Sequence, residues 1–153
     1  MVWHYENTCT SKHPPEVVWD YLTDYTPGDH NTPVFKAENK GKDWPREVER
    51  LPGNKVHLKD TAARFWTDIV VDLSDRPNKI PTEGKANLGT WQGMTTVSRT
   101  PEGGTSWHSN IDITPDRFGA KILFAILGGS IRKRFIKHEN KHFLEFEAAM
   151  AGK

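Results

Sequence analysis

The segment that decides the fold is residues 116–150, which reads DRFGAKILFAILGGSIRKRFIKHENKHFLEFEAAM. Apolar and histidine side chains recur in it at steps of three and four, at Phe124, Leu127, Ile131, Phe135, His138, His142, Phe146 and Ala149. This spacing places them on one face of an α-helix. A helix of this length is about 50 Å long, since each residue adds about 1.5 Å. It therefore needs a large surface on which to lie.

The expected start of this helix is marked by three consecutive residues. Thr114 can cap it, Pro115 suits the first helical position, and Asp116 puts a negative charge in the first turn. Gly128 and Gly129 interrupt the interior, where each glycine costs about 1 kcal/mol relative to alanine. Two interpretations of the pair stay open at this point: a bend or close approach, or small residues on a solvent-facing side.

Composition sets limits on the class of protein. The 153 residues suit one domain spanning 1–153, and the net charge of +1 gives no reason to expect nucleic acid as a partner. The single Cys9 excludes an internal disulfide and is consistent with a reducing compartment. The first residues do not form a signal peptide, and the most apolar segment, 118–131, is too short to span a bilayer. We expect a soluble cytoplasmic protein without integral membrane association.

The residues before the long helix predict strands and a little helix. A helix starting at Pro15 is expected to turn Val18, Trp19 and Leu22 inward, and residues 26–30 allow only a short further turn of helix. Period-two patterns and turn residues predict seven strands, at 3–10, 46–51, 55–61, 64–74, 79–85, 91–100 and 105–114.

The last two strands allow their register to be predicted. Pro101-Glu102-Gly103 suits a three-residue hairpin loop, so paired residue numbers sum to 204 and Val97 lies opposite Trp107. This register puts the apolar residues of both strands on one face, and it turns His108, Asn110 and Asp112 to the other. The agreement between loop length and hydrophobic pattern supports the pairing.

This order of elements resembles the START-like, or SRPBCC, superfamily, which includes polyketide cyclases and lipid-transfer proteins and shares the fold of the birch pollen allergen. The residues that carry the resemblance are 15–24 (PEVVWDYLTD), 101–105 (PEGGT) and the glycine-interrupted helix 118–149. The resemblance implies an α+β helix-grip fold. A seven-stranded curved antiparallel sheet wraps around the long C-terminal helix, and two short helices follow the first strand. Because this superfamily has no universal catalytic motif, the resemblance leaves function open.

A curved sheet cannot touch a straight helix everywhere, so an apolar cavity between them is expected. The primary hypothesis is that this cavity binds or transports a small hydrophobic molecule. The expected lining residues are Phe65, Thr67, Ile69, Trp91, Thr95, Val97, Trp107, Ser109, Ile111, Phe124, Leu127, Ile131 and Phe135. Inward hydroxyls among them need hydrogen-bond partners, from a ligand, from water or from one another. Replacing Gly128 by leucine is expected to maintain or raise thermal stability, and to shrink the cavity if this glycine faces inward.

Two further functions stay open. An enzyme of the polyketide cyclase or dehydrase type needs an inward acid or base, and Asp29-His30 is the nearest candidate pair in sequence; no catalytic residue is assigned. A protein-binding module, like the chaperone-ATPase activators of the same superfamily, needs an exposed apolar patch, hinted at by Trp66 and Val70. We favour a non-catalytic ligand-binding protein, with a protein partner as a further possibility and without a cofactor.

Residues 138–142 match the zinc-protease pattern H-E-x-x-H. The pattern places His138 and His142 one helical turn apart, with Glu139 as the potential base. A third protein ligand is missing after them, and the helix already has a role in covering the sheet. We therefore interpret the match as coincidental and expect no metal site.

Overall fold

The computed structural model describes residues 1–25, 36–37, 39–42, 45–61 and 66–152. The elements in order are β1 (Trp3–Ser11), α1 (Pro15–Leu22), β2 (Arg46–Leu51), β3 (Lys55–Asp60), β4 (Thr67–Asp72), β5 (Lys79–Ala86), β6 (Gly89–Arg99), β7 (Thr105–Pro115) and α3 (Phe118–Ala151). They confirm the α+β helix-grip architecture. Of the two short helices expected after β1, one is α1; the residues expected to hold the second, 26–30, lie outside the described residues.

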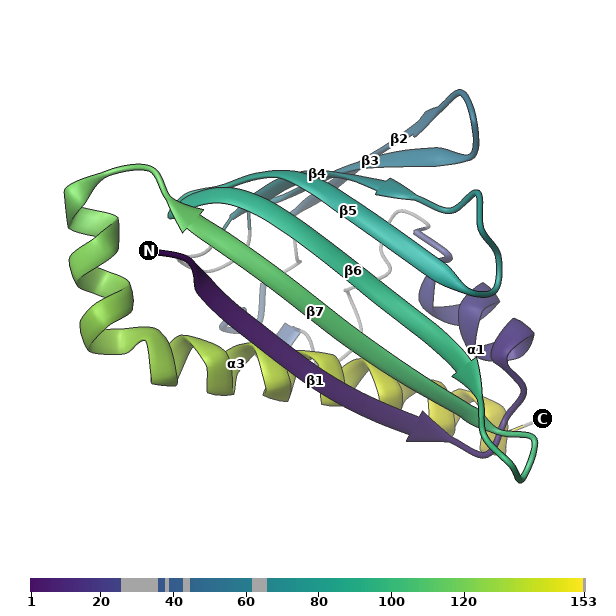
Figure 1. The fold of residues 1–153 in the computed structure, drawn as a ribbon. Helices are drawn as coiled ribbons and strands as arrows, with labels where there is room; N and C mark the ends of the chain where they lie inside the picture. Colours follow the sequence, from purple (N-terminus) through teal and green to yellow (C-terminus); the bar gives the residue numbers. More distant parts are fainter. Residues whose placement is uncertain (26–35, 38, 43–44, 62–65, 153) are drawn as a thin grey trace.

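The strands form one curved antiparallel sheet in the order β1-β7-β6-β5-β4-β3-β2. Each strand from β2 to β6 pairs with the next along the chain, and β1 pairs with β7 at one edge. Figure 1 shows the sheet curling over α3, which runs behind it and alongside β1.

The predicted register of the last hairpin is confirmed. Val97 lies opposite Trp107, and Thr95 lies opposite Ser109. The concave face carries the apolar rows of the sheet, including Ile113, Trp91 and Ile69, each at most 9 % exposed. These rows and the facing side chains of α3 and α1 make up the core, because both layers present their apolar faces to each other.

The helix α3 begins later than its sequence suggests. Thr114 and Pro115 remain in β7, where they pair with Thr90 and Gly89, and the helix starts at Phe118 with Arg117 as its N-cap residue. Strand pairing with β6 has therefore prevailed over the capping pattern. Figure 1 also shows α3 bent, with its first turns at a steep angle to the remainder. The glycine pair lies towards this end of the helix, and such pairs are among the known causes of sharp kinks.

The helix presents only part of the predicted face to the sheet: Phe124 and Phe146 are buried as predicted, but at other positions the inward row is shifted by one residue. Its buried residues are Ala120, Phe124, Gly128, Phe143 and Phe146. The inward row thus passes through Gly128, Glu139 and Phe143 rather than through Leu127, His138 and His142. The two sets differ by one position because steps of three and of four are both compatible with one helical face.

Candidate functional site

The middle of the concave face is not closed by the helix. Among the strands, α3 packs chiefly on β1 at the edge of the sheet, with a smaller contact to β7. Four inward side chains near the centre remain partly exposed: Thr95 and Ile111 from the sheet, and Ile131 and Phe135 from the helix. We call these four residues the open concave region. Aromatic core residues close it on both sides, since Trp91 and Trp107 are 7 % and 8 % exposed.

The structure divides the predicted lining residues into several groups. Besides the four of the open concave region, six are buried in the core: Ile69, Trp91, Val97, Trp107, Ser109 and Phe124. Thr67 is partly exposed, further along the sheet on β4. Leu127 is 44 % exposed and leaves the inward position to Gly128, so it does not join the others. Phe65 lies outside the described residues.

A cluster of polar side chains borders the open concave region. Asn7, Ser109 and Thr95 occupy neighbouring positions in one row across β1, β7 and β6. Above this row, Glu139 of α3 accepts a hydrogen bond of 2.8 Å from Asn7 Nδ2, and it also bonds to the hydroxyl of Ser109. Cys9 Sγ lies 3.8 Å from Glu139 Oε1. We call Asn7, Cys9, Ser109 and Glu139 the interior polar cluster.

Burial changes the acid–base character of this cluster. Loss of water raises the pKa of the Glu139 carboxyl above its usual range, although hydrogen bonds from Ser109, Asn7 and Cys9 oppose the shift. Burial, together with the nearby Glu139 charge, raises the pKa of the Cys9 thiol to about 12. Cys9 is therefore an inert thiol at neutral pH. Glu139 is the member whose proton affinity is shifted towards neutral conditions.

Tyr5 brings a further polar atom to the same part of the core. Its side chain is only 1 % exposed, and its hydroxyl makes no well-formed hydrogen bond among the described residues, although the Asn7 side chain interacts with it. Its ring packs on Phe135, with 5.3 Å between ring centroids. Burial is the main cause of its raised pKa, with the Glu139 charge adding to it, so the hydroxyl keeps its proton. A buried hydroxyl without a partner costs free energy, which a bound polar group can recover.

Glu139 is the functional candidate that sequence reasoning missed. The H-E-x-x-H pattern indicates Glu139 only as the base of a zinc site, whereas its position four residues from both Phe135 and Phe143 is the signal for an inward side chain. His138 and His142 stack edge to face at 5.0 Å between ring centroids. Within the described part of the chain, no group of three or more His, Cys, Asp or Glu side chains is arranged to hold a metal ion. Asp29 and His30 lie outside the described residues.

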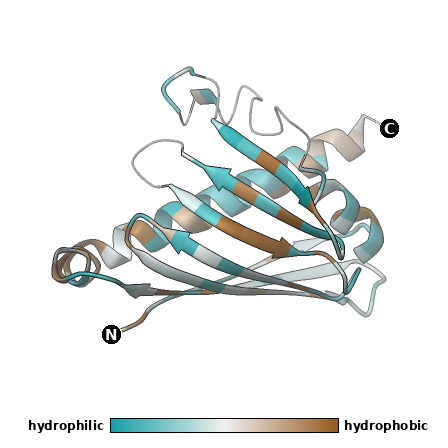
Figure 2. Ribbon diagram, turned by 90° about the horizontal axis from the view of Figure 1, so that it is seen from above, coloured by the Kyte–Doolittle hydropathy of each residue, from teal (hydrophilic) through white to brown (hydrophobic). Residues whose placement is uncertain are grey.

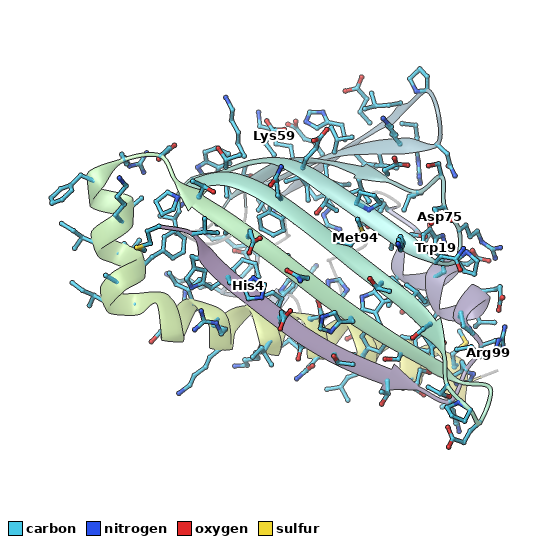
Figure 3. The ribbon with its side chains drawn as sticks, viewed as in Figure 1. His4, Trp19, Lys59, Asp75, Met94 and Arg99 are labelled. Carbon is cyan, nitrogen blue, oxygen red and sulfur yellow. The ribbon has the colours of Figure 1, made fainter. Side chains whose placement is uncertain are left out.

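The outer face of the sheet offers a different kind of surface. A shallow hollow of about 470 Å³ lies over β4 to β7, and its lining includes Met94, Asp72, Glu83 and Asp112. Figure 3 labels Met94 in the middle of this face. The charged rim makes the hollow a poor place for an apolar molecule, because carboxylates would lose water without gaining partners. Trp66, one of the two residues suggesting a protein partner, is 39 % exposed.

The shifted pKa of Glu139 gives a first testable prediction. A raised folded-state pKa means that Glu139 favours folding most when protonated, and that this contribution is lost as pH rises through the folded pKa. Glu139→Gln keeps the shape without the charge. We expect the variant to gain stability relative to wild type as pH rises from about 4 to about 8, and the pH-dependent part of the difference to be smallest below the usual glutamate pKa of about 4.3. Urea unfolding at several pH values measures the difference, and a difference independent of pH would contradict it.

Comparison with known proteins identifies the fold. No family model and no curated protein sequence matches the chain. Among solved structures, the ZhuI aromatase/cyclase from Streptomyces sp. R1128 superposes with a TM-score of 0.72 at 15 % identity, over 96 % of this chain and 94 % of that one. Ara h 8.0201 gives a TM-score of 0.65 at 17 % identity over the whole of both chains. TTHA0849 from Thermus thermophilus gives 0.66 at 12 % identity, over 95 % of this chain and 94 % of that one.

At these identities the likeness concerns the fold and not the activity. The likeness extends over almost the entire chain. It agrees with the order of the strands, the register of the last hairpin and the long helix that covers the sheet. The protein therefore has the helix-grip fold of the START-like, or SRPBCC, superfamily.

Proposed function

We propose that the protein binds a small hydrophobic molecule in the open concave region, between β6, β7 and α3. The observation that carries this proposal is the partial exposure of Ile111, Ile131 and Phe135 on surfaces that face each other inside the fold. Apolar side chains in such a position gain about 25 cal/mol for each Å² that a ligand removes from water. The fold is shared with a protein named as an aromatase/cyclase, and this likeness supports the proposal.

The interior polar cluster defines the polar end of the ligand. Burial raises the pKa of Glu139, so its carboxyl can donate a hydrogen bond when it is protonated, and the Tyr5 hydroxyl is a second donor whose hydrogen bonding in the structure is poor. Ser109 adds a hydroxyl in the same place. Donors grouped at one end of an apolar space suit a ligand whose polar end accepts hydrogen bonds, such as a ketone, an ester or a quinone.

Two neighbouring residues on β6 provide a matched test of this site. Thr95 points to the concave face and pairs with Ser109, whereas Thr96 points to the outer face and pairs with His108. Thr95→Trp is expected to weaken ligand binding by about tenfold or more, because the indole fills the open concave region. Thr96→Trp adds the same side chain on the other face and is expected to leave binding unchanged. Titration calorimetry with palmitate, cholesterol and an anthraquinone measures the effect.

Circular dichroism and thermal unfolding establish that both variants are folded. If the tryptophan prevents folding, Thr95→Leu replaces it in the test, because leucine reduces the same space by a smaller change. The proposal fails if wild type binds none of the three probes, or if Thr96→Trp weakens binding as much as Thr95→Trp does. Preference for the anthraquinone over palmitate would support the polar end described above, because a quinone oxygen accepts hydrogen bonds without bringing a negative charge next to the Glu139 carboxyl.

A catalytic role is a second candidate, favoured by the position of Glu139 beside the open concave region. In a cyclase-type reaction, its carboxylate would take a proton from a carbon next to a carbonyl. The enolate would then form a carbon–carbon bond with a second carbonyl, whose oxygen receives the proton from Glu139. The test is turnover of an aromatic diketone by wild type, with Glu139→Gln expected to retain binding and lose turnover. If wild type shows no turnover, the catalytic role fails and ligand binding remains the proposed function.

A further inference from the structure

The first turns of α3 carry apolar side chains on the side turned away from the sheet. Phe118, Ile122 and Ile126 are 77 %, 43 % and 74 % exposed. Their spacing of four places them in one line along the helix. The opposite side of the same turns is buried, with Ala120 and Phe124 at 2 % and 4 % exposure. These turns carry hydrophobic colouring in Figure 2.

This part of the helix is therefore apolar on two sides, and the sheet covers only one of them. Within residues 118–127, Lys121 is the only charged residue. A helix that is apolar nearly all round is normally covered on all sides, and large exposed apolar patches on soluble domains mark interaction surfaces. Leu127, at 44 % exposure, extends the patch towards the bend.

The charges around the patch indicate what covers it. Residues 117–138 contain no Asp or Glu, and their basic residues are Arg117, Lys121, Arg132, Lys133, Arg134 and Lys137. Two of these have partners: Arg117 lies 3.9 Å from the Asp116 carboxylate, and Arg132 donates to the carbonyl of His4. The whole chain has a net charge of only +1, so this segment concentrates positive charge beside exposed apolar side chains. A second copy of the chain would bring the same positive charges and be repelled, whereas an anionic surface attracts them.

We propose that the first turns of α3 bind the surface of an anionic lipid bilayer. Phe118, Ile122 and Ile126 insert at the boundary between headgroups and acyl chains, and Arg117 and Lys121 bind the phosphates. Apolar side chains beside basic ones on a helix are the combination that holds peripheral proteins at this boundary. Among the described residues no helix has the length and apolar character to cross a bilayer. The binding proposed here is at the surface, and it does not depend on the ligand-binding function.

Vesicle co-sedimentation of the full chain tests the proposal. We expect binding to vesicles of phosphatidylcholine with about 30 mol% phosphatidylglycerol, weaker binding to phosphatidylcholine alone, and a fall in binding as salt rises from about 50 mM to about 500 mM. Phe118→Ser with Ile126→Ser is expected to weaken binding about tenfold or more. Lys121→Glu, which reverses a charge, is expected to weaken it about fivefold or more at low salt.

Leu144→Ser is the matched control. Leu144 is 69 % exposed on the same helix but lies far along it from the patch, so its replacement is expected to leave vesicle binding unchanged. Equal binding to neutral and anionic vesicles, no binding at all, or the same loss in Leu144→Ser would each overturn the proposal. A soluble dimer would also overturn it, if wild type does not bind vesicles and sedimentation velocity shows that Phe118→Ser with Ile126→Ser dissociates the dimer.

Discussion

Replacing Trp3 by alanine is expected to lower the free energy of unfolding by about 3–5 kcal/mol, the usual cost of truncating a large buried aromatic residue. Trp3 is 4 % exposed and joins the edge strand β1 to the helix α3. Its ring lies 5.2 Å from the ring of Phe124 and 5.4 Å from that of Phe135, between centroids. Its indole Nε1 donates a hydrogen bond of 3.2 Å to the carbonyl of Gly128.

The expected loss is large compared with the total stability of a domain of this kind, about 5–15 kcal/mol. Urea unfolding followed by circular dichroism measures it, since fluorescence itself depends on the tryptophan removed. Trp66→Ala is the matched control: Trp66 is 39 % exposed, and its loss is expected to cost about 1 kcal/mol or less. Similar losses in the two variants would mean that Trp3 does not hold the helix to the sheet.

The sheet could be predicted from the sequence because its signals are local. The loop Pro101-Glu102-Gly103 sets a register of its own, and the hydrophobic alternation of both flanking strands agrees with that register. The sequence predicts too early a start for α3 because Thr114 and Pro115 form a plausible cap by themselves. Their pairing with β6 is a tertiary contact, and it decides between two local possibilities.

The interior polar cluster could not be predicted in the same way. A sequence pattern assigns apolar residues to the inside and a charged residue to the outside, because a buried charge without partners is costly. Glu139 is tolerated on the inward row because Asn7 and Ser109 bond to it from β1 and β7. Those partners are far away in the sequence, so the decision between Glu139 and His138 as the inward residue required the packed structure.

The sequence leaves two interpretations of Gly128 and Gly129 open: a bend or close approach, or small residues on the solvent side. The structure decides between them for each glycine separately. Gly128 is buried, and a Cβ atom added to it would lie 3.2 Å and 3.3 Å from Nε1 and Cδ1 of Trp3. Gly129 is exposed, and an added Cβ would meet no atom within 4 Å. The pair thus combines both interpretations: Gly128 allows close approach to the sheet, and Gly129 lies on the solvent side.

This asymmetry reverses the expectation for Gly128→Leu that the sequence suggests. A leucine there meets the indole of Trp3, which cannot move freely because it is stacked on Phe124 and bonded to the carbonyl of Gly128. We expect the overpacking to lower the free energy of unfolding by about 1–3 kcal/mol, more than the gain in helix propensity offsets. Gly129→Leu makes the same chemical change in open space and is expected to raise stability by about 0.7 kcal/mol.

Urea unfolding of the two leucine variants beside wild type measures the contrast, and near-ultraviolet circular dichroism reports whether the indole of Trp3 has moved. Gly128→Ala is a milder form, since it brings the Cβ contact without the rest of the leucine side chain. If Gly128→Leu and Gly129→Leu unfold at the same urea concentration, Trp3 gives way to the added side chain. The close contact at Gly128 would then not be what fixes the first turns of α3 against β1.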